Sequence, residues 1–495
     1  MHQADGAALA IFSAATRNHN HDEEDIFMTN ELQHSNLSTS VSRFFSRILM
    51  AALAAGVLLF SAAISAQSQQ TEATKPPTFS VLYAFKGGAD GVGPGIGIAA
   101  SNLALDGDGN VYGTTFDGGE LSSSYCSFGG CGVVFKVDRA GNESVLHTFT
   151  GPPDGAGPLA GVIRDEEGNL YGAAYDGGLE GSVCNGCGTI FKIDRAGNET
   201  SLYNFSGTPD GISPAGVVIR DSEGNFYGTT QFGGASAPGS VCSSTSFACG
   251  TVFRLDRTGK ETVLHSFSDG ADGSGPQAGL VRDEEGNLYG TTPYGGTSGN
   301  GVVFKLDPAG KETILYTFTG LTDGGAPFGG LTRDSDGTLY GMTSEGGLDG
   351  NGVIFKLNPH GKFSVLYSFT GGADGGVPYG TLVRDGSDLY GTTYFGGIYT
   401  AFQGDFNGVV FKLDATSKET VVYSFGGLAD GANPNGNLTV DAEGNLYGTT
   451  QFGGDLANQA SPCYGFGCGV VFKIALHDKC DESANKSEIL QSRSR

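Results

Sequence analysis

Residues 280–318 read LVRDEEGNLYGTTPYGGTSGNGVVFKLDPAGKETILYTF and contain four short runs with the composition of β-strands. The runs are residues 280–283, 287–292, 301–307 and 312–318, each rich in β-branched or aromatic residues. The connections DEEGN and DPAGK carry the Asp, Pro and Gly residues that form tight hairpins. No window in this segment shows helical periodicity, so the segment predicts a four-stranded antiparallel unit.

The same unit recurs along the chain at intervals of 50 to 62 residues, measured between its Tyr-Gly pairs. Repeats near 50 residues with four strands each are typical of propeller blades. The sequence therefore predicts an all-β fold, a seven-bladed β-propeller with four antiparallel strands per blade. The tyrosines of the pairs are Tyr112, Tyr171, Tyr227, Tyr289, Tyr340, Tyr390 and Tyr447.

The order of the strands predicts how the ring closes. The first strand-like run, residues 79–85, matches the fourth strand of the unit, whereas the last run, residues 469–474, matches the third. We expect the N-terminal strand 79–85 to complete the last blade, which would leave no free sheet edge. The alternative phasing, in which this strand opens the first blade, needs no such closure. The propeller would span residues 79–475.

The segment before the repeats has the pattern of an export signal. Residues 1–66 form a leader whose apolar h-region, residues 48–64, follows Arg43 and Arg47, and cleavage is expected near Ala66. The alternative is an uncleaved membrane anchor. The true start is Met1 or Met28, residues 67–78 form a linker, and residues 476–495 form a polar tail. We expect a secreted or periplasmic protein without membrane insertion after cleavage.

The charge of the chain limits its partners. The formal net charge is −25, and such a surface repels phosphate backbones and anionic membranes. Nucleic acid is therefore not an expected partner. Neutral or basic ligands, and cations, remain compatible with this charge.

The repeat resembles the Gloeo/Verruco (GloVer) tandem repeat of exported bacterial proteins. The resemblance rests on GNLYGTT at 444–450, Gly453-Gly454 and GVVFKI at 469–474, with counterparts in every repeat. It implies export and a propeller-like fold, and it implies no known reaction. Members often carry a C-terminal surface anchor, but residues 476–495 contain no apolar tail.

Two long connections per blade are expected on one face, opposite the tight hairpins, and we place any ligand site on this loop-rich face. One connection carries the motif DGxxP. Its carboxylates could form a ring around the central opening and attract a cation, or each could simply cap a turn. They are Asp90, Asp154, Asp210, Asp272, Asp323, Asp374 and Asp430.

Aromatic residues begin the other connection, after the GTT segment. They could stack on sugar rings or anchor a protein partner, or they could pack between adjacent blades. The fifth repeat has Ser344-Glu345 instead, an asymmetry that a specific site requires. The aromatic residues are Phe116, Tyr175, Phe232, Tyr294, Tyr394, Phe395 and Phe452.

Eight of the nine cysteines form close pairs, and the second member of each pair lies just before a third strand. After export these pairs should form loop-closing disulfides. Zinc ligation or redox chemistry is the alternative, but the sequence contains no second CxxC or nearby His to complete a zinc set. Cys480 is left over. The pairs are Cys126 with Cys131, Cys184 with Cys187, Cys242 with Cys249, and Cys463 with Cys468.

The sequence carries no catalytic signature such as GxSxG or HExxH. We assign no catalytic residue, metal ligand or cofactor. The DGDGN stretch at 106–110 resembles the start of a calcium loop but aligns with ordinary hairpins, and His147 and His265 replace a fourth-strand tyrosine as packing variants. We expect a binding or structural protein that recognises a glycan or a protein at the cell surface. The alternative is a carbohydrate-active or lactone-hydrolysing enzyme using central carboxylates.

Overall fold

The computed structural model describes residues 76–93, 102–121, 125–126, 129–179, 184, 186–235, 249–398, 407–455, 463 and 466–476. The chain divides into two compact units, Met1–Thr74 and Lys75–Arg495, and all of the described residues belong to the second. Within these residues, no helix is long and apolar enough to span a membrane. The predicted leader, most of the linker and the tail lie outside the described residues.

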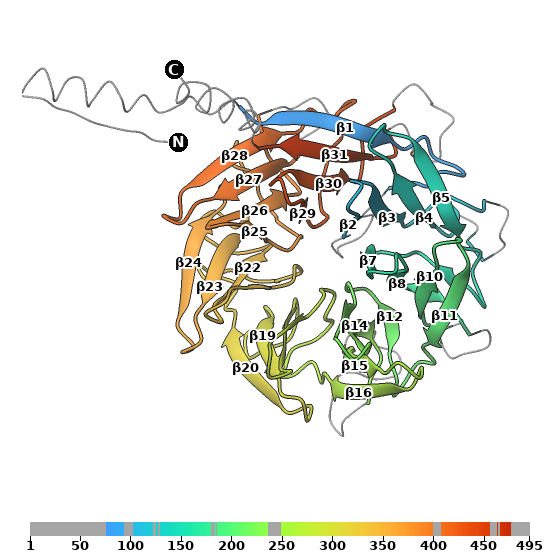
Figure 1. Cartoon of the computed structure of the whole chain (residues 1–495). Coiled ribbons are helices and arrows are strands. Elements are labelled where there is room, and N and C mark those ends of the chain that lie inside the picture. Colours follow the sequence, from blue (N-terminus) through green and yellow to red (C-terminus); the bar gives the residue numbers. More distant parts are fainter. Residues whose placement is uncertain are drawn as a thin grey trace, which may run out of the picture. The chain divides into compact units, whose positions relative to one another are not determined.

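Seven antiparallel sheets follow one another around a ring (Figure 1), which confirms the predicted propeller. The first three blades are β2 (Ala104–Leu105), β3 (Val111–Thr115), β4 (Val133–Val137) and β5 (Glu143–Thr148); β7 (Val162–Arg164), β8 (Leu170–Ala174), β10 (Thr189–Ile193) and β11 (Glu199–Asn204); and β13 (Ile219–Arg220), β14 (Phe226–Phe232), β15 (Thr251–Leu255) and β16 (Glu261–Ser266).

The next three blades have the same order, from the inner strand to the outer strand. They are β17 (Val281–Arg282), β18 (Leu288–Thr292), β19 (Val302–Leu306) and β20 (Glu312–Thr317); β21 (Thr332–Arg333), β22 (Leu339–Thr343), β23 (Val353–Leu357) and β24 (Phe363–Ser368); and β25 (Val383–Asp385), β26 (Asp388–Thr393), β27 (Val409–Leu413) and β28 (Glu419–Ser424).

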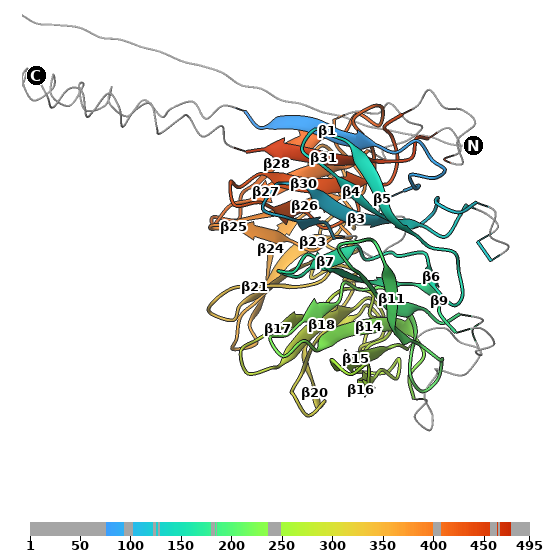
Figure 2. The same ribbon diagram turned by 45° about the vertical axis from the view of Figure 1, so that its right-hand side comes forward.

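The seventh blade joins the two ends of the repeat array. Its strands are β29 (Thr439–Val440), β30 (Leu446–Thr450), β31 (Val470–Ala475) and the N-terminal β1 (Thr78–Ala84). Strand β1 pairs antiparallel with β31, from Thr78 opposite Ala475 to Ala84 opposite Val470. The predicted closure by the N-terminal strand is confirmed, with the strand one residue earlier than expected. Figure 2 shows the two strands side by side at the closure.

A ring of phenylalanine pairs joins the blades. At each junction the Phe after an outer strand contacts, edge to face, the Phe of the third strand in the next blade, as Phe318 does with Phe355 at 5.3 Å between ring centroids. Such pairs add about 1 kcal/mol each beyond the area that they bury. The others are Phe85–Phe135, Phe149–Phe191, Phe205–Phe253, Phe267–Phe304, Phe369–Phe411 and Phe425–Phe472.

Glycine is required where the second strand crosses the phenylalanine of the third. A Cβ on Gly290 would lie 2.6 Å from the Phe304 ring, closer than any real contact. The neighbouring Tyr289 points the other way and donates from Oη to Asp283 at 2.9 Å in the first hairpin of the blade. In this Tyr-Gly pair, the glycine therefore leaves room for the phenylalanine on one face of the sheet, and the tyrosine binds the hairpin aspartate on the other.

A cation–aromatic contact links neighbouring blades near the hairpins. Arg384 of the sixth blade lies 4.9 Å from the centre of the Tyr340 ring in the fifth and pairs with Asp334 at 3.6 Å. Four other junctions carry the same contact: Arg164 over Tyr112, Arg220 over Tyr171, Arg282 over Tyr227, and Arg333 over Tyr289. The remaining two junctions have Leu105 and Val440 in place of the arginine.

Candidate functional site

The two long connections of neighbouring blades meet on one face, as predicted. The main chain of Ser274, in the DGxxP link, pairs with Tyr294 in the variable loop of the next blade. Equivalent pairings join Val92 with Asp117, Gly325 with Glu345, Gly376 with Phe395, and Ala432 with Phe452. The link and the variable loop thus form one continuous surface from blade to blade.

The aspartates of the DGxxP motif hold turns beside the outer strands. Asp323 accepts a hydrogen bond from Tyr316 Oη at 2.9 Å and another from the Thr319 N–H at 2.9 Å. Tyrosine also binds the corresponding aspartate in the Tyr83–Asp90, Tyr203–Asp210, Tyr367–Asp374 and Tyr423–Asp430 pairs, whereas His147 binds Asp154. The carboxylates therefore lie with the outer strands and do not form a ring around the central opening.

The remaining residues of the motif are also explained by packing. A Cβ on Gly273 would lie 2.2 Å from Thr292 Oγ1, and the Pro276 ring lies against Gly250. The residue before the proline adopts a left-handed conformation even where it is Val377, with φ of 54°. The turn interpretation of DGxxP accounts for each of these contacts.

Neighbouring blades also approach each other closely just before their inner strands. A Cβ on Gly329 would lie 2.1 Å from the Gly380 carbonyl oxygen in the next blade. Thr291 Oγ1 donates to the Gly329 carbonyl oxygen at 2.9 Å across a junction. These close approaches bring neighbouring backbones together where larger side chains would not fit.

Some of the predicted aromatic residues pack between blades. Tyr175 Oη donates to Gln231 in the third blade at 2.7 Å, and Tyr394 Oη donates to Gln451 in the seventh at 2.9 Å. Phe116 and Tyr175 also pack against Leu159. Among the rest, Phe452 contacts Phe466, Phe395 contacts Tyr394, and Phe232 ends strand β14.

Four aromatic rings form a continuous arc across the fourth, fifth and sixth blades. Tyr294 contacts Phe328 at 5.8 Å, Phe328 contacts Tyr379 at 5.6 Å, and Tyr379 contacts Tyr394 at 5.5 Å, all steeply inclined. We call these residues the aromatic arc. Tyr294 is 42% exposed and Tyr379 and Tyr394 are partly exposed, so these three rings reach the surface, whereas Phe328 is only 7% exposed and supports them from below.

Sequence reasoning identified Tyr294 and Tyr394 but missed Phe328 and Tyr379. These two directly follow the proline of the DGxxP motif, where the other repeats carry Gly, Leu, Ala, Gln or Asn. That departure from the repeat was the available signal.

A carboxylate accompanies the arc. Glu345 is exposed and belongs to the fifth blade, where it takes the position that Tyr294 holds in the fourth. Burial, followed by the charge of Glu345, raises the pKa of Tyr294 and of Tyr379 above the usual value for tyrosine. The arc therefore offers apolar ring faces, phenol groups and one negative charge.

A second hollow lies over the first and second blades. Its volume is about 290 Å³, and its lining includes Asp117, Tyr125 and Asp176. Burial raises the pKa of Asp117 to about 6 and that of Asp176 to about 6. Both aspartates occupy the loop position that is aromatic in four other blades, and sequence reasoning missed them because the adjacent Phe116 and Tyr175 drew attention instead.

Disulfides brace these loops, as predicted. Cys126–Cys131, Cys184–Cys187 and Cys463–Cys468 are bonded, with Cα atoms 5.2 to 5.4 Å apart. Cys249 is also disulfide-bonded, while its predicted partner Cys242 and the unpaired Cys480 lie outside the described residues.

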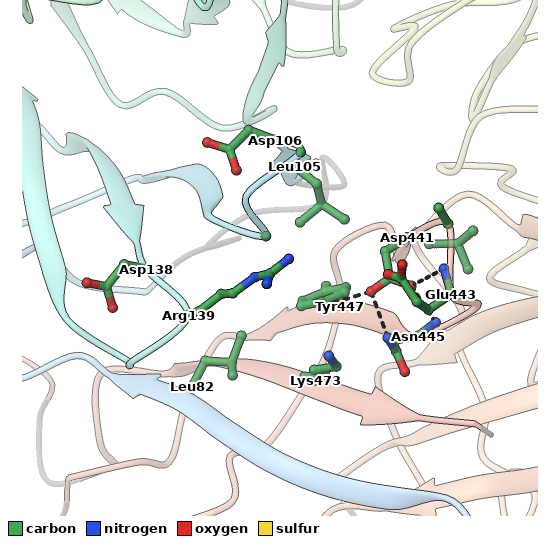
Figure 3. Close-up of a pocket in the computed structure, with 14 residues that line it drawn as sticks. Leu82, Leu105, Asp106, Asp138, Arg139, Asp441, Glu443, Asn445, Tyr447 and Lys473 are labelled. Atoms are coloured by element: carbon green, nitrogen blue, oxygen red, sulfur yellow. Dashed lines mark hydrogen bonds between the residues drawn. The ribbon is translucent and has the colours of Figure 1, made fainter. Parts of the chain in front are cut away.

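A larger hollow, of about 680 Å³, lies beside the hairpins at the junction of the seventh and first blades. Leu105 stands here where an arginine covers the tyrosine at five other junctions. In Figure 3, Arg139 extends from the hairpin after β4 toward Tyr447 and partly fills the gap. The hollow thus follows from the missing arginine, and it lies away from the loop-rich face.

Solved structures with similar folds have low identity to this chain. The extracellular domain of a candidate one-component system from B. thetaiotaomicron is 11% identical with a TM-score of 0.45, covering 79% of this chain, which spans 39% of that one. A candidate 6-phosphogluconolactonase from Bacteroides uniformis is 18% identical with a TM-score of 0.40, covering 64% of this chain and 82% of its own. No curated protein matches the sequence.

The family profile agrees with the repeat structure. The profile described as the Gloeobacter/Verrucomicrobia repeat matches residues 121–334 and 313–485, and these matches include Tyr-Gly pairs with the hairpin and packing contacts described above. Together they cover more than half of the chain, so the chain belongs to the Gloeobacter/Verrucomicrobia repeat family.

Proposed function

We propose that this protein is an exported carbohydrate-binding propeller that recognises a glycan through the aromatic arc. The observation that carries the proposal is the continuous contact of Tyr294, Phe328, Tyr379 and Tyr394, with Glu345 beside it. The arc occupies only part of the ring, as specific recognition by a repeat protein requires.

The chemistry of the arc suits a neutral sugar. Aromatic faces offer a large apolar area at a small entropic cost, and phenol groups add hydrogen bonds at the edge. A carboxylate accepts strong hydrogen bonds from hydroxyl groups. Sugars present both an apolar face of C–H groups and a rim of hydroxyls, so they match this combination.

Two observations support action outside the cytoplasm. Disulfides persist mainly in oxidising compartments, and four loops of this chain carry bonded cysteines. Residues 48–64 have the pattern of a signal-peptide h-region. A secreted or periplasmic location, with a glycan at the cell surface as the partner, follows as part of the proposal.

A glycan array with the purified protein tests the proposal. The Tyr379→Ala variant should bind each glycan that the unmodified protein binds with an affinity that is lower by about tenfold or more. The control is His360→Ala, an exposed position in the hairpin after β23, which should bind normally. Absence of any glycan ligand, or equal binding by the Tyr379→Ala variant, would overturn the proposal. Binding of a protein partner without any glycan ligand would also contradict glycan recognition.

A second candidate function is acid–base hydrolysis in the hollow over the first two blades. It is favoured by two carboxyl groups, Asp117 and Asp176, that line one cavity and have pKa values raised by burial to about 6. A group with such a pKa can hold and release a proton near neutral pH. A glycosidase and lactonase screen tests this, with Asp117→Asn and Asp176→Asn expected to abolish turnover. Turnover that survives both substitutions would exclude it.

A further inference from the structure

The outer strands of neighbouring blades meet at seven junctions, which we call the outer junctions. In most of them a tyrosine of one blade donates a hydrogen bond to the aspartate of the DGxxP motif, as Tyr316 does to Asp323. The next blade contributes the first residue of its outer strand. Between the third and fourth blades this pattern changes, because His265 stands in place of the tyrosine and Glu312 begins the next outer strand.

The three polar side chains at this junction surround one point. His265 Nε2 lies 3.8 Å from Asp272 Oδ2 and 3.7 Å from Glu312 Oε1. One ligand atom from each residue lies within 4.8 Å of the others. The side chains of His265, Asp272 and Glu312 are only 18%, 19% and 13% exposed.

Two of these ligand atoms lack a hydrogen-bond partner among the described residues. His265 Nε2 and Glu312 Oε1 are both shielded from solvent, and neither forms a hydrogen bond. The other histidine junction differs, because His147 Nε2 lies 3.2 Å from both oxygens of Asp154 and its hydrogen bond is satisfied. Glu199 Oε1 at the His147 junction also lacks a partner, so the two junctions differ in the histidine: His265 Nε2 is buried without a hydrogen bond, which is costly, whereas His147 Nε2 is not.

We propose that His265, Asp272 and Glu312 bind a divalent transition cation of the zinc class and thereby join the third and fourth blades. One imidazole and two carboxylates are donors that Zn²⁺ accepts, with metal–ligand distances of about 2.1 Å. A tetrahedral arrangement at that distance places the ligand atoms about 3.4 Å apart. The two separations from His265 Nε2 therefore need to shorten by only a few tenths of an ångström, while the oxygens of Asp272 and Glu312, which lie within 4.8 Å of each other, approach to the same distance as the side chains turn toward the ion.

The position of the three residues gives the ion a structural role. His265 and Asp272 belong to the third blade and its link, whereas Glu312 opens β20 in the fourth. The partial exposure leaves room for water as a fourth ligand. Because the ion would bind the folded chain and not the unfolded one, it would raise the stability of the protein by mass action.

Titration with Zn²⁺ after complete removal of metal tests the proposal, with calorimetry and thermal melting as readouts. The decisive variant is His265→Tyr, which restores the residue found at five other outer junctions and should fold normally. The matched control is His147→Tyr, the same change at the junction between the first and second blades. Glu312→Gln removes one charged ligand without changing the size of the side chain.

The unmodified protein and the His147→Tyr variant should bind one equivalent of Zn²⁺ that the His265→Tyr variant lacks. Zn²⁺ should raise the melting temperature of the first two proteins by several degrees and leave that of His265→Tyr unchanged. Glu312→Gln should bind at least tenfold more weakly. Comparison with the His265→Tyr variant separates this site from Zn²⁺ bound by histidines of the leader. Equal stoichiometry and equal melting shifts in the His265→Tyr variant would overturn the proposal. The absence of Zn²⁺ binding by the unmodified protein would also overturn it.

Discussion

The outer junctions fall into two kinds, which differ in the residue at the start of the outer strand that packs against the preceding blade. At two of them a phenylalanine at the start of the outer strand stacks on the tyrosine of the preceding blade: the ring centroids of Phe363 and Tyr316 are 3.8 Å apart, and those of Phe79 and Tyr423 are 3.9 Å apart. At the other five this residue is a glutamate. The glutamates are Glu143, Glu199, Glu261, Glu312 and Glu419.

The difference shows that one scaffold position can hold either an apolar ring or a partly buried acid. Burial, followed by the charge of the neighbouring aspartate, raises the pKa of Glu143, Glu261 and Glu419 to about 7. One carboxylate oxygen of each has no hydrogen-bond partner in the described part of the chain. The stacked junctions therefore contribute stability, whereas the acidic junctions cost stability once the glutamates ionise.

The largest effect is expected from removing a stacked ring. Phe363→Ala should lower the free energy of unfolding by about 3 kcal/mol, because it removes the stack on Tyr316 and leaves a cavity between blades. Glu419→Ala should change it by less than about 1 kcal/mol. Denaturant unfolding at pH 7.5 measures both, and equal losses would show that the two kinds of junction do not differ in energy.

A smaller change in the free energy of unfolding is expected when the pH of the solution is raised. A glutamate whose pKa is raised from 4.5 to about 7 on folding contributes stability below pH 4.5 that is lost as the pH rises through 7. The free energy of unfolding should therefore fall between pH 5 and pH 8, by about 2 kcal/mol for the three glutamates after allowance for solvent screening.

The triple variant Glu143→Gln, Glu261→Gln and Glu419→Gln isolates this contribution. Its unfolding free energy should change less over the same pH range, since the amides do not titrate. A curve parallel to that of the unmodified protein would mean that other groups carry the pH dependence.

The smallest effect is expected from converting one kind of junction into the other. Glu419→Phe should stack on Tyr367, as Phe363 does on Tyr316, and should raise the free energy of unfolding by about 1 kcal/mol at pH 8. The reciprocal Phe363→Glu variant should lose stability as the pH rises. A destabilised Glu419→Phe variant at pH 8 would show that this junction has no room for a ring.

Most of the fold could be predicted from the sequence because the repeat encodes it directly. The spacing of the Tyr-Gly pairs predicted seven blades, and the isolated fourth-strand run at the N-terminus predicted the closure by β1. The paired cysteines before third strands predicted the disulfides. These features depend on local composition and order, which a sequence displays.

The candidate sites were harder to predict because they depend on contacts between blades. Phe328 and Tyr379 join the aromatic arc only where the link of one blade meets the loop of another. Asp117 and Asp176 line one hollow although they belong to different repeats. The aspartates of DGxxP could be identified from the sequence, but their hydrogen bonds to side chains of the outer strands required the three-dimensional structure.

The absence of tryptophan from the chain allows a direct measurement of carbohydrate binding at the aromatic arc. The Tyr379→Trp variant places a single indole in the arc, and His360→Trp places one on the hairpin face as a control. Titration with an array-positive glycan should shift the indole emission of Tyr379→Trp saturably, in line with the binding curve, and leave that of His360→Trp unchanged. Glycan binding at the same affinity with no emission change at position 379, or with a change only at position 360, would contradict the account.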